Sequence, residues 1–496
     1  MTDTISRRSL LKSTAVAVAG WSAVNATWVT AAEAATTPGM VPVPRLDGTL
    51  EFAPRLTGNF TTDFGKLVKS SPKAVLRPGS VQDIVKMVNY ARRNRLKIAM
   101  NGQGGTGDDL ESHSNYGQAG VSGGIAVDAR SLSKIHRIDK SSAVVDAGVT
   151  WAALCEATLA RGKVPPALTD YLHLSIGGTV SVGGIGGMTH RYGLQCDIVE
   201  EIEIVTGEGR VLTASPSVRP ELFRAALAGG GQVGIITRLK VKLVPAPARV
   251  MIFSLYYDDL STYLADQEKI LSEGRFNYQA GEIVRKPDDS GWRYKIEVGA
   301  YFTPPSTPDQ KALLADLRDD RAAMEVAEHD YREWIFRVDG FEAFLKENGY
   351  WEQAKPWLSL ILPASQVKRF ITTVVAELVP DDLGAGISLL SPFWRSKLTC
   401  PLFALPETRD KVLYLFDLLR FPHPGSSDIQ RMLEQNRRFY DQAVALGGKR
   451  YLVGAIPNMT NQDWRRHFGR QWNFLAMSKL RFDPDNVLTP GQGFFA

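Results

Sequence analysis

The residues best suited to chemistry lie in the stretch from Asp170 to Gly187. Six of its eighteen residues are glycine, and its only charge is the carboxylate of Asp170. Glycine lets the backbone approach a ligand closely, and the N–H groups of glycine-rich turns bind phosphate oxygens. A carboxylate beside them can accept a proton. The stretch therefore indicates a phosphate-bearing cofactor next to an acid/base residue, or else a glycine-rich surface loop with a solvated Asp170.

A second glycine-rich segment, Gly102–Gly107, follows a strand predicted over residues 96–100 and satisfies the G-x-G-x-x-G pattern. A dinucleotide site of the Rossmann type needs a helix to begin at these glycines, and residues 108–124 have no helical periodicity. That interpretation is therefore the weaker one. The same loop carries His113, and histidine is a nucleophile that can bond covalently to a cofactor. The alternative for His113 is an ordinary solvated loop residue.

The composition excludes several classes of function. At 496 residues the chain is long enough for two or more domains. Its net charge of +5 is spread along the sequence without a basic cluster, so we predict no nucleic-acid partner. The cysteines, Cys155, Cys196 and Cys400, are few and far apart in the sequence, and the histidines show no ligand spacing. We therefore predict no disulfide framework and no metal site.

The N-terminus has the features of an export signal. Arg7 and Arg8 precede a moderately apolar run at residues 13–29, and Ala32-Glu33-Ala34 offers a small-x-small cleavage site. Polar residues and a glycine interrupt the apolar run, so it is poor as a permanent membrane span. We expect residues 1–35 to be a Tat signal peptide outside the fold. The Tat export machinery would then be a partner, and the protein would be periplasmic or secreted.

The elements that must position these residues begin with a strand, a helix and a strand. Ser80-Val81-Gln82-Asp83 predicts a capping box at the start of the helix. From about residue 245 glycine becomes sparser and aromatic residues accumulate, which predicts a second domain. Its predicted strands cover 251–257 and 293–301, and its predicted helices cover 365–378 and 409–419. We expect the chain to return to the first domain near residues 435–447.

Several ordered motifs together resemble one family. They are Leu76-Arg77-Pro78, His113-Ser114-x-x-Gly117-Gln118, Thr169-Asp170-Tyr171-Leu172, Gly231-Gln232-Val233-Gly234 and Leu488-Thr489-Pro490-Gly491-Gln492. Each is weak alone, but in this order they resemble FAD-linked oxidases of the vanillyl-alcohol-oxidase type, most closely the cytokinin dehydrogenases.

The resemblance implies an α+β fold. A two-part FAD-binding domain of the vanillyl-alcohol-oxidase (PCMH-like) type would carry an inserted substrate (cap) domain made of an antiparallel sheet and helices. The expected boundaries are 40–244 for the first part of the FAD-binding domain, 245–435 for the substrate domain and 436–496 for the C-terminal segment.

The resemblance also implies roles for individual residues. His113 would be bonded covalently to the flavin of FAD, and Asp170 would be the acid/base facing the substrate. Ile236 would meet the adenosine half of the cofactor. The remaining expected cofactor contacts are Gly102, Gly104, Ser114, Gln118, Ser175, Gly178 and Ser181 along the pyrophosphate, and Tyr451, Thr489 and Gln492 on the isoalloxazine side.

The chain departs from the family pattern at two places. The family runs G-x-G-H-S without a break, whereas eight residues separate Gly104 from His113 here. Either the insertion loops out and His113 still reaches the flavin, or Gly105 takes the position of the histidine and FAD is not covalently bound. The second departure is Ala280, where cytokinin dehydrogenases carry a substrate-binding glutamate. Glu282 lies two residues further along a predicted strand, on the same face, and is expected to substitute for it.

The expected function is that of an FAD-dependent oxidoreductase acting on a small-molecule substrate, an aromatic compound or an amine. Asp170 would take a proton while hydride passes to flavin N5, and oxygen or a quinone-like compound would be the electron acceptor. One alternative is an oxidase of an alcohol, phenol or sugar from the same superfamily. A distant alternative is a flavin-binding protein that has lost catalysis.

Overall fold

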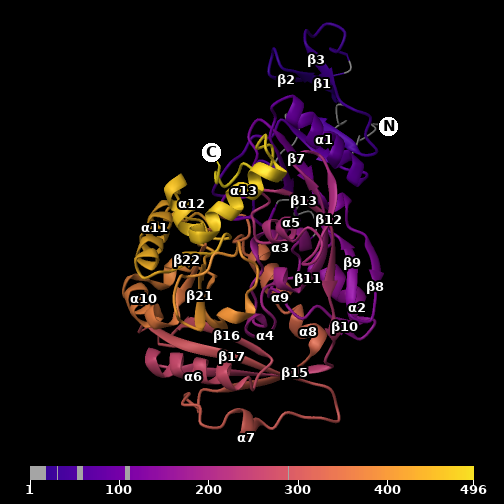
Figure 1. The fold of residues 1–496 in the computed structure, drawn as a ribbon. Coiled ribbons are helices and arrows are strands. Elements are labelled where there is room, and N and C mark those ends of the chain that lie inside the picture. Colours follow the sequence, from indigo (N-terminus) through magenta and orange to yellow (C-terminus); the bar gives the residue numbers. More distant parts are fainter. Residues whose placement is uncertain (1–17, 31, 53–59, 107–111, 289, 496) are drawn as a thin grey trace, which may run out of the picture.

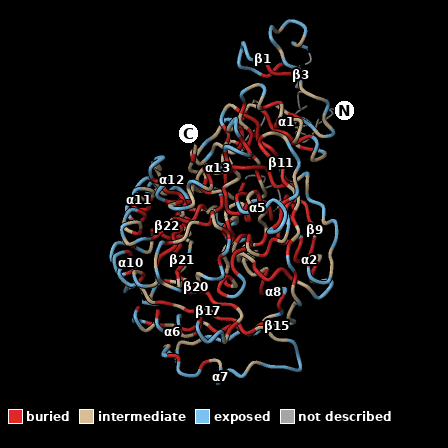
Figure 2. The backbone as a smooth tube through the Cα atoms, in the orientation of Figure 1, coloured by how far each residue is buried: buried red, intermediate tan, exposed pale blue. Residues whose placement is uncertain are grey.

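Two sheet systems face each other in the computed structural model, which describes residues 18–30, 32–52, 60–106, 112–288 and 290–495 (Figure 1). The first system is built mainly from the first half of the chain and contains a four-stranded and a five-stranded sheet. The second is an eight-stranded sheet from the second half. Figure 2 shows that the buried residues follow the strands of both systems. This arrangement confirms the expected α+β fold.

The four-stranded sheet has the order β4-β5-β7-β6 and is covered by the helix α1. Strands β5, β7 and β6 are parallel, and β4 is antiparallel to β5. Helix α1 buries Ile84, Met87 and Val88 against them because these residues recur at helical spacing. The elements are β4 (Thr49–Phe52), β5 (Ala74–Arg77), α1 (Val81–Arg93), β6 (Ile98–Asn101) and β7 (Ile125–Asp128).

Helix α1 begins where the sequence predicts, but not through the predicted capping box. The Ser80 side chain caps no helix N–H and donates instead to Asp47 Oδ2 at 2.6 Å. The carboxylate of Asp83 accepts from the backbone N–H groups of Asp47, Gly48 and Gly79. The capping-box prediction is therefore wrong, because the preceding loop competes for both side chains.

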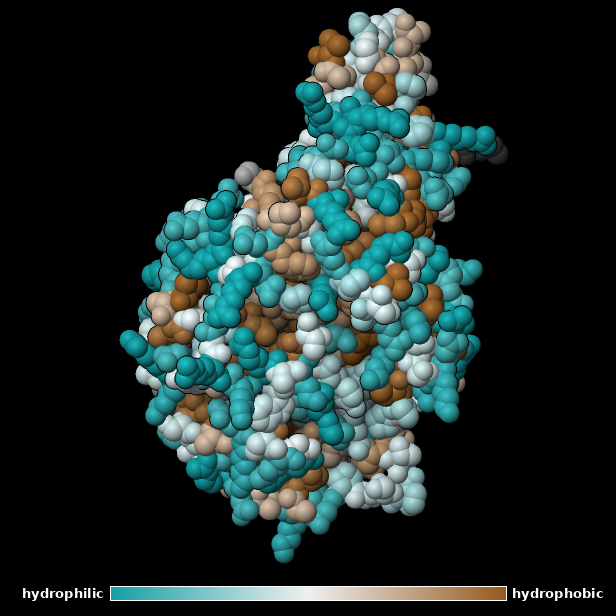
Figure 3. Space-filling view, in the orientation of Figure 1, coloured by the Kyte–Doolittle hydropathy of each residue, from teal (hydrophilic) through white to brown (hydrophobic). Residues whose placement is uncertain are grey.

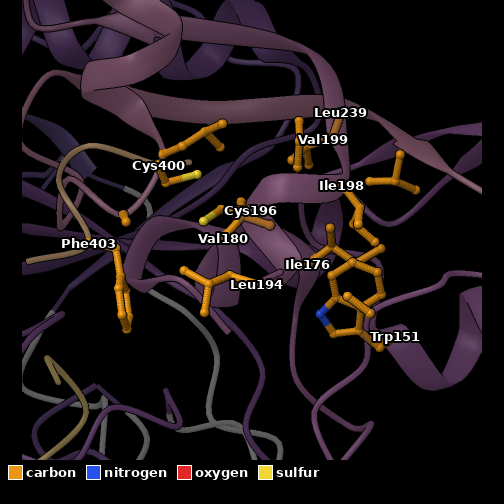
Figure 4. Packing of buried hydrophobic residues seen from close by; sticks show 14 of the residues in the cluster. Trp151, Ile176, Val180, Leu194, Cys196, Ile198, Val199, Leu239, Cys400 and Phe403 are labelled. Atoms are coloured by element: carbon orange, nitrogen blue, oxygen red, sulfur yellow. The ribbon is translucent and has the colours of Figure 1, made fainter. Parts of the chain in front are cut away.

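The five-stranded sheet is antiparallel and has the order β12-β11-β13-β9-β8. Its core includes the fully buried Trp151 and Ile176 (Figure 4). The elements are β8 (Ile135–Ile138), β9 (Ser142–Asp146), α2 (Trp151–Leu159), α3 (Ile176–Val182), β11 (Val199–Thr206), β12 (Val211–Ala214), α5 (Pro220–Ala226) and β13 (Gly234–Lys242). Shorter elements are β10 (Lys163–Val164), α4 (Thr189–Tyr192) and β14 (Val244–Pro245).

The eight-stranded sheet is antiparallel throughout and has the order β18-β15-β17-β16-β20-β21-β19-β22. Helices α6, α10 and α11 pack on one face, where they share one core with the strands. The strands are β15 (Arg249–Tyr257), β16 (Tyr278–Arg285), β17 (Trp292–Phe302), β18 (Glu325–Asp330), β19 (Leu358–Pro363), β20 (Ile387–Trp394), β21 (Val412–Leu419) and β22 (Lys449–Arg450). The helices are α6 (Leu260–Glu273), α7 (Gln310–Leu313), α8 (Tyr331–Ile335), α9 (Val338–Glu347), α10 (Ala364–Glu377) and α11 (Ile429–Ala445).

The helix predicted over residues 409–419 is wrong, because this segment forms strand β21. Tyr414, Phe416 and Leu418 point toward the covering helices, and Leu413 and Leu415 belong to the core on the other face. A strand buried on both faces is a continuous apolar run, and periodicity alone cannot distinguish such a run from a buried helix.

The chain returns to the first sheet system later than predicted. Helix α11 packs on β19 and β22 and so belongs with the eight-stranded sheet. Only after it do α12 (Asn461–Phe468) and α13 (Trp472–Phe482) lead back, with α13 beside α5 (Figure 1). Ile98 of β6 then exchanges backbone hydrogen bonds with Val487 and Thr489. The surface seen in Figure 3 is mostly hydrophilic, with apolar side chains in small groups.

Part of the predicted signal segment has a defined structure. Strands β1 (Val18–Ser22), β2 (Thr27–Thr30) and β3 (Met40–Pro42) form a small antiparallel sheet at the top of Figure 1. Trp28 stacks on Tyr90 of α1 with ring centroids 5.9 Å apart. The twin arginines lie outside the described residues. Within the described part of the chain, no helix is both long and apolar enough to cross a membrane.

Candidate active site

A cavity of about 410 Å³ lies where the two sheet systems meet. This volume is typical of sites for small molecules and cofactors. One wall is formed by glycine-rich loops of the first system, and another by side chains of β16, β20 and β21 from the eight-stranded sheet. Helix α9 and an aromatic group complete the lining.

The glycine-rich wall is shaped for a ligand that approaches the backbone closely. A side chain at Gly102 would place its Cβ 2.1 Å from Ser175 Oγ, so a larger residue would displace the Ser175 hydroxyl. Gly184, Gly230 and Gly231 have positive φ values, which glycine adopts readily. Of the expected cofactor contacts, the cavity lining contains Gly102, His113, Ser114, Gln118, Asp170, Ser175, Gly178, Ser181, Ile236, Tyr451, Thr489 and Gln492.

The structure places His113 at the cavity wall. Its imidazole stacks on Phe64 with ring centroids 3.8 Å apart, and Nδ1 lies 2.8 Å from the carbonyl oxygen of Gly104. Burial lowers the pKa of His113 to about 4, and nearby Lys355 acts in the same direction. The ring is therefore neutral at pH 7 and keeps a nitrogen lone pair available.

Gly104 holds His113 rather than lining the cavity. A Cβ at Gly104 would lie 2.4 Å from both the Cβ and the backbone N of His113, so the two residues pack backbone against backbone. Residues 107–111 of the insertion lie outside the described part of the chain. Gly105 is not among the described residues that line the cavity, so the arrangement favours the alternative in which the insertion loops out.

Two side chains after His113 brace its loop. The Ser114 hydroxyl donates to Asp63 Oδ2 at 2.8 Å. Gln118 Oε1 accepts from the N–H groups of Asn115 and Tyr116, while Gln118 Nε2 donates to the carbonyl of Leu452 at 2.6 Å. Gln118 therefore links this loop to the C-terminal part of the chain.

The C-terminal part closes the cavity with three of the expected residues. The Tyr451 hydroxyl accepts from the N–H of Gly184 at 3.1 Å, and Thr489 Oγ1 donates to the carbonyl of Gly231 at 3.0 Å. Gln492 Nε2 is buried and has no hydrogen-bond partner among the described residues. A buried amide donor without a partner at a glycine-lined wall fits a ligand rich in acceptors, such as FAD.

Asp170 meets two side chains from distant elements. Its Oδ1 accepts from Arg337 Nη2 at 2.8 Å and from the Tyr278 hydroxyl at 3.3 Å. Arg337 lies between α8 and α9 and is also 3.9 Å from the ring centroid of Trp334. Burial disfavours the guanidinium charge, yet Tyr278 and Asp170 hold the pKa of Arg337 above its ordinary range. The carboxylate is thus fixed beside a permanent cation.

Glu282 does not join Asp170. Its Oε1 lies 2.6 Å from Lys295 Nζ on the neighbouring strand β17, and Glu282 is not among the residues that line the cavity. Ala280 is the residue of β16 in the lining. The expectation that Glu282 substitutes at the substrate site is therefore corrected. It shares the face of Ala280, but two residues along a strand move it by about 7 Å, beyond the cavity edge.

Helix α9 ties the cofactor loops together through Glu342. Its Oε1 accepts from Thr106 Oγ1 at 2.6 Å and its Oε2 from the Tyr171 hydroxyl at 2.7 Å, with Lys346 Nζ 2.8 Å away. Burial alone would raise the pKa of Glu342, but the hydrogen bonds from Lys346, Thr106 and Tyr171 lower it below its usual value. Glu342 stays ionised and joins the loops that carry His113 and Asp170.

The structure brings together three residues that are remote in the sequence. The ligand atoms of Cys196, Asp197 and Cys400 lie within 4.8 Å of one another, and Figure 4 shows the two sulfur atoms facing each other. Separation in the sequence therefore does not exclude a metal-binding group here, because the fold brings these residues together. Asp197 Oδ1 already accepts from Thr399 and from the N–H of Cys400. We assign no metal to this group.

Sequence reasoning missed several residues of the site. Arg337 and Glu342 belong to no motif that we identified, and Tyr278 lies in the segment of Ala280 and Glu282 without an assigned role. Only the fold brings these side chains to Asp170 and His113. The aromatic enrichment after residue 245 was a usable signal, because it includes Phe341, Trp351 and Trp357 of the lining. The other aromatic lining residues are Phe64, Tyr171, Phe421 and Tyr451.

Comparison with known proteins gives matches along most of the chain. A family profile described as "Cytokinin dehydrogenase 1, FAD and cytokinin binding" matches residues 284–495, and one described as "FAD binding domain" matches residues 72–215. An oxidoreductase of Rhodococcoides fascians, ORF5 in the fasciation locus, is 37% identical over 430 residues, which are 86% of this chain and 95% of that protein.

Plant proteins give matches of similar extent. Cytokinin dehydrogenase 2 of Arabidopsis thaliana is 32% identical over 484 residues, covering 91% of this chain and 94% of that protein. Cytokinin dehydrogenase 3 of Oryza sativa subsp. japonica is 34% identical over 495 residues, covering 90% of this chain and 91% of that protein. Together with the two matching profiles, these relatives show that the chain belongs to the cytokinin dehydrogenase family and is an FAD-dependent oxidoreductase of that type.

Proposed function

We propose that this enzyme oxidises a small aromatic or amine substrate of the cytokinin class, with Asp170 as the proton acceptor. The observation that carries the proposal is the Asp170 carboxylate at the cavity wall, held by Arg337 and Tyr278. The names of the relatives support the substrate class. FAD, when bound, supplies the acceptor for hydride.

Each residue of the site has a separate role in the proposed reaction. Asp170 takes the proton from the substrate N–H as hydride leaves the adjacent carbon, which yields an imine that water hydrolyses. The guanidinium of Arg337 keeps the carboxylate in one orientation, so that no reorganisation is needed during the reaction. The aromatic lining, including Phe341 and Trp357, excludes water from the reacting atoms.

Replacement of the acceptor tests the mechanism. We expect Asp170→Asn to slow substrate-dependent reduction of the flavin by about 10²–10⁴-fold, the usual contribution of a positioned base, while flavin content is retained. The measurement is anaerobic mixing of a cytokinin with the holoenzyme, followed through the visible flavin absorbance. Asp339→Asn is the matched control, because that carboxylate pairs with His173 and is not in the lining. An Asp170→Asn enzyme as fast as the parent would sink the proposal.

We propose further that FAD is bonded to His113. The support is a buried, neutral imidazole at the cavity wall, beside the glycine-lined surface. After acid precipitation of the holoenzyme, the yellow colour should stay in the pellet, and peptide mass mapping should place the flavin on His113. For His113→Ala we expect flavin in the supernatant. Release of all flavin from the parent protein would show that binding is non-covalent.

A second candidate substrate class is favoured by one observation. The residue of β16 in the lining is Ala280, where the family resemblance leads us to expect a glutamate. A site without that carboxylate would suit an alcohol, phenol or sugar, which Asp170 would deprotonate at O–H to give a carbonyl product. Parallel reduction assays with an N-alkyl adenine, a benzylic alcohol and an aldose decide between the classes.

Export and the electron acceptor complete the proposal. The twin-arginine segment supports export by the Tat machinery to the periplasm or beyond, and Arg7→Lys/Arg8→Lys should leave the protein in the cytoplasm in fractionation. Oxygen or a quinone-like compound would reoxidise the flavin. Oxygen uptake measured against quinone reduction in the same preparation identifies which acceptor is used.

A further inference from the structure

The eight-stranded sheet presents one carboxyl group to the cavity, that of Asp417. Seven residues of this sheet line the cavity, and the other six are apolar or serine. They are Ala280, Ile387, Leu389, Ser391, Leu415 and Leu419. Asp417 is therefore the only charged residue that the described strands of this sheet place in the cavity lining, and the mechanism above does not use it.

Asp417 is buried and incompletely hydrogen-bonded. The residue is 6% exposed, and its carboxyl oxygen Oδ1 has no hydrogen-bond partner among the described residues. Its register partner on β19 is Ser359, whose buried hydroxyl is the polar group beside the carboxyl. Buried polar atoms without partners are rare in folded proteins, and such an oxygen on a cavity-lining residue indicates a ligand group.

The place of Asp417 in the sheet determines which end of a bound substrate contacts this residue. Tyr278, which contacts Asp170, lies on β16, and β20 separates β16 from β21. Asp417 pairs with Leu389, and Leu389 pairs with Glu282, which lies four residues along β16 from Tyr278. Two strand spacings across the sheet and four residues along it place Asp417 roughly 16 Å from Tyr278. A substrate whose oxidised bond lies at Asp170 would reach Asp417 with its opposite end.

We propose that Asp417 binds a hydrogen-bond donor, a hydroxyl or amino group, on the end of the substrate that lies away from Asp170. The proposal rests on the proposed function and deepens it, because it assigns a specificity-determining residue to the same cavity. A substrate with a purely hydrocarbon end leaves the carboxyl group unpaired in the complex, and sites of this kind reject analogues that lack the donor.

The test uses two ligands that differ only by a hydroxyl group at the far end of an N-alkyl adenine side chain. The parent holoenzyme should bind the hydroxylated ligand more tightly, and Asp417→Leu should lose this preference by about tenfold or more. Binding is measured by titration calorimetry with both ligands, and turnover is measured separately. Ser388→Ala is the matched control, because Ser388 is buried in the same sheet and is not in the cavity lining.

Asp417→Asn guards against a folding defect in the leucine variant, since it keeps the shape of the side chain. The asparagine variant should bind both ligands but discriminate less between them. The proposal is overturned if Asp417→Leu changes the affinity for both ligands equally, or if this variant still prefers the hydroxylated ligand. Loss of flavin from both variants with unchanged discrimination would also overturn it, because Asp417 would then hold the cofactor. If neither ligand is oxidised by the parent, the proposed function fails, and the calorimetric preference still decides the role of Asp417.

Discussion

Arg337 is the residue on which the geometry of Asp170 depends. It contacts the carboxylate at 2.8 Å, the Tyr278 hydroxyl at 2.9 Å and the face of Trp334. The planar guanidinium is held by an aromatic face on one side while it donates to the carboxylate. One residue outside every recognised motif therefore fixes the orientation of the proposed base.

We predict that Arg337→Gln slows substrate-dependent flavin reduction by about 10–100-fold, because a neutral amide neither pairs with the carboxylate nor stacks as a cation. Anaerobic stopped-flow absorbance measures this rate. Arg332→Gln is the control, because Arg332 pairs with Glu156 and not with Asp170. Equal rates for the parent and Arg337→Gln would show that Asp170 needs no cation.

Asp417 should give the protein a measurable pH dependence of stability. Burial raises its pKa from 3.8 to about 7, the neighbouring Ser359 hydroxyl opposing the shift, and Tyr451 is the titratable group affected by its charge. Between these values the folded protein holds a proton that the unfolded chain has released. The contribution of Asp417 to stability is therefore fully present below about pH 4 and is lost as the pH rises to about 7.

We therefore predict that Asp417→Asn unfolds at a higher temperature than the parent at about pH 8, and that the difference shrinks toward about pH 4. Thermal unfolding of the two proteins across this pH range measures the difference, and the comparison cancels the other titrating groups. A gap between the two unfolding temperatures that does not change with pH would contradict the raised pKa.

Helix α9 acts as a brace between elements that are far apart in the chain. Glu342 receives hydrogen bonds from Thr106 on the loop before His113 and from Tyr171 beside Asp170. Both bonds are charge-assisted, and the carboxylate is buried. The substrate domain thus contributes to the order of the loops that surround the proposed covalent linkage.

We predict that Glu342→Gln lowers the free energy of unfolding by about 1–3 kcal/mol, because Lys346 loses its charged partner and one acceptor becomes an amide donor. The fraction of covalently bound flavin should fall with it, since the loop before His113 loses its anchor. Urea unfolding and the acid-precipitation assay measure the two effects. Glu347→Gln, an exposed position on the same helix, should change neither quantity.

At the scale of the whole molecule, the C-terminal segment joins the two sheet systems. Asp483 is fully buried and pairs with Lys479 Nζ at 2.7 Å. Its two carboxylate oxygens also accept from the N–H groups of Val487 and Leu488. These bonds turn the chain toward the cavity, where Thr489 follows directly.

We predict that Asp483→Ala lowers the free energy of unfolding by about 3–5 kcal/mol, because Lys479 remains as a buried cation without its partner. Flavin retention during gel filtration should also fall, since Thr489 and Gln492 are no longer held at the cavity. Chemical unfolding and the ratio of flavin to protein absorbance measure both effects. Asp485→Ala is the control, because that side chain is 57% exposed. Equal losses in the two variants would contradict the anchoring role.

The sequence by itself determined the family, the two-part α+β fold and the residues that line the glycine-rich wall. These features are local: glycine-rich turns, strand–helix units and a histidine in its motif keep their meaning wherever the chain folds. The structure accordingly places His113, Asp170, Ser175 and Tyr451 at one cavity.

Only the tertiary structure decided which side chains meet across the cavity. Arg337 reaches Asp170 from 167 residues away, and Glu282 turns to Lys295 instead of the substrate site. The Asp417 carboxyl faces the cavity because β21 is a strand buried on both faces, whereas its apolar run alone suggested a helix. Such contacts depend on sheet order and register, which are set by long-range packing and leave no local pattern in the sequence.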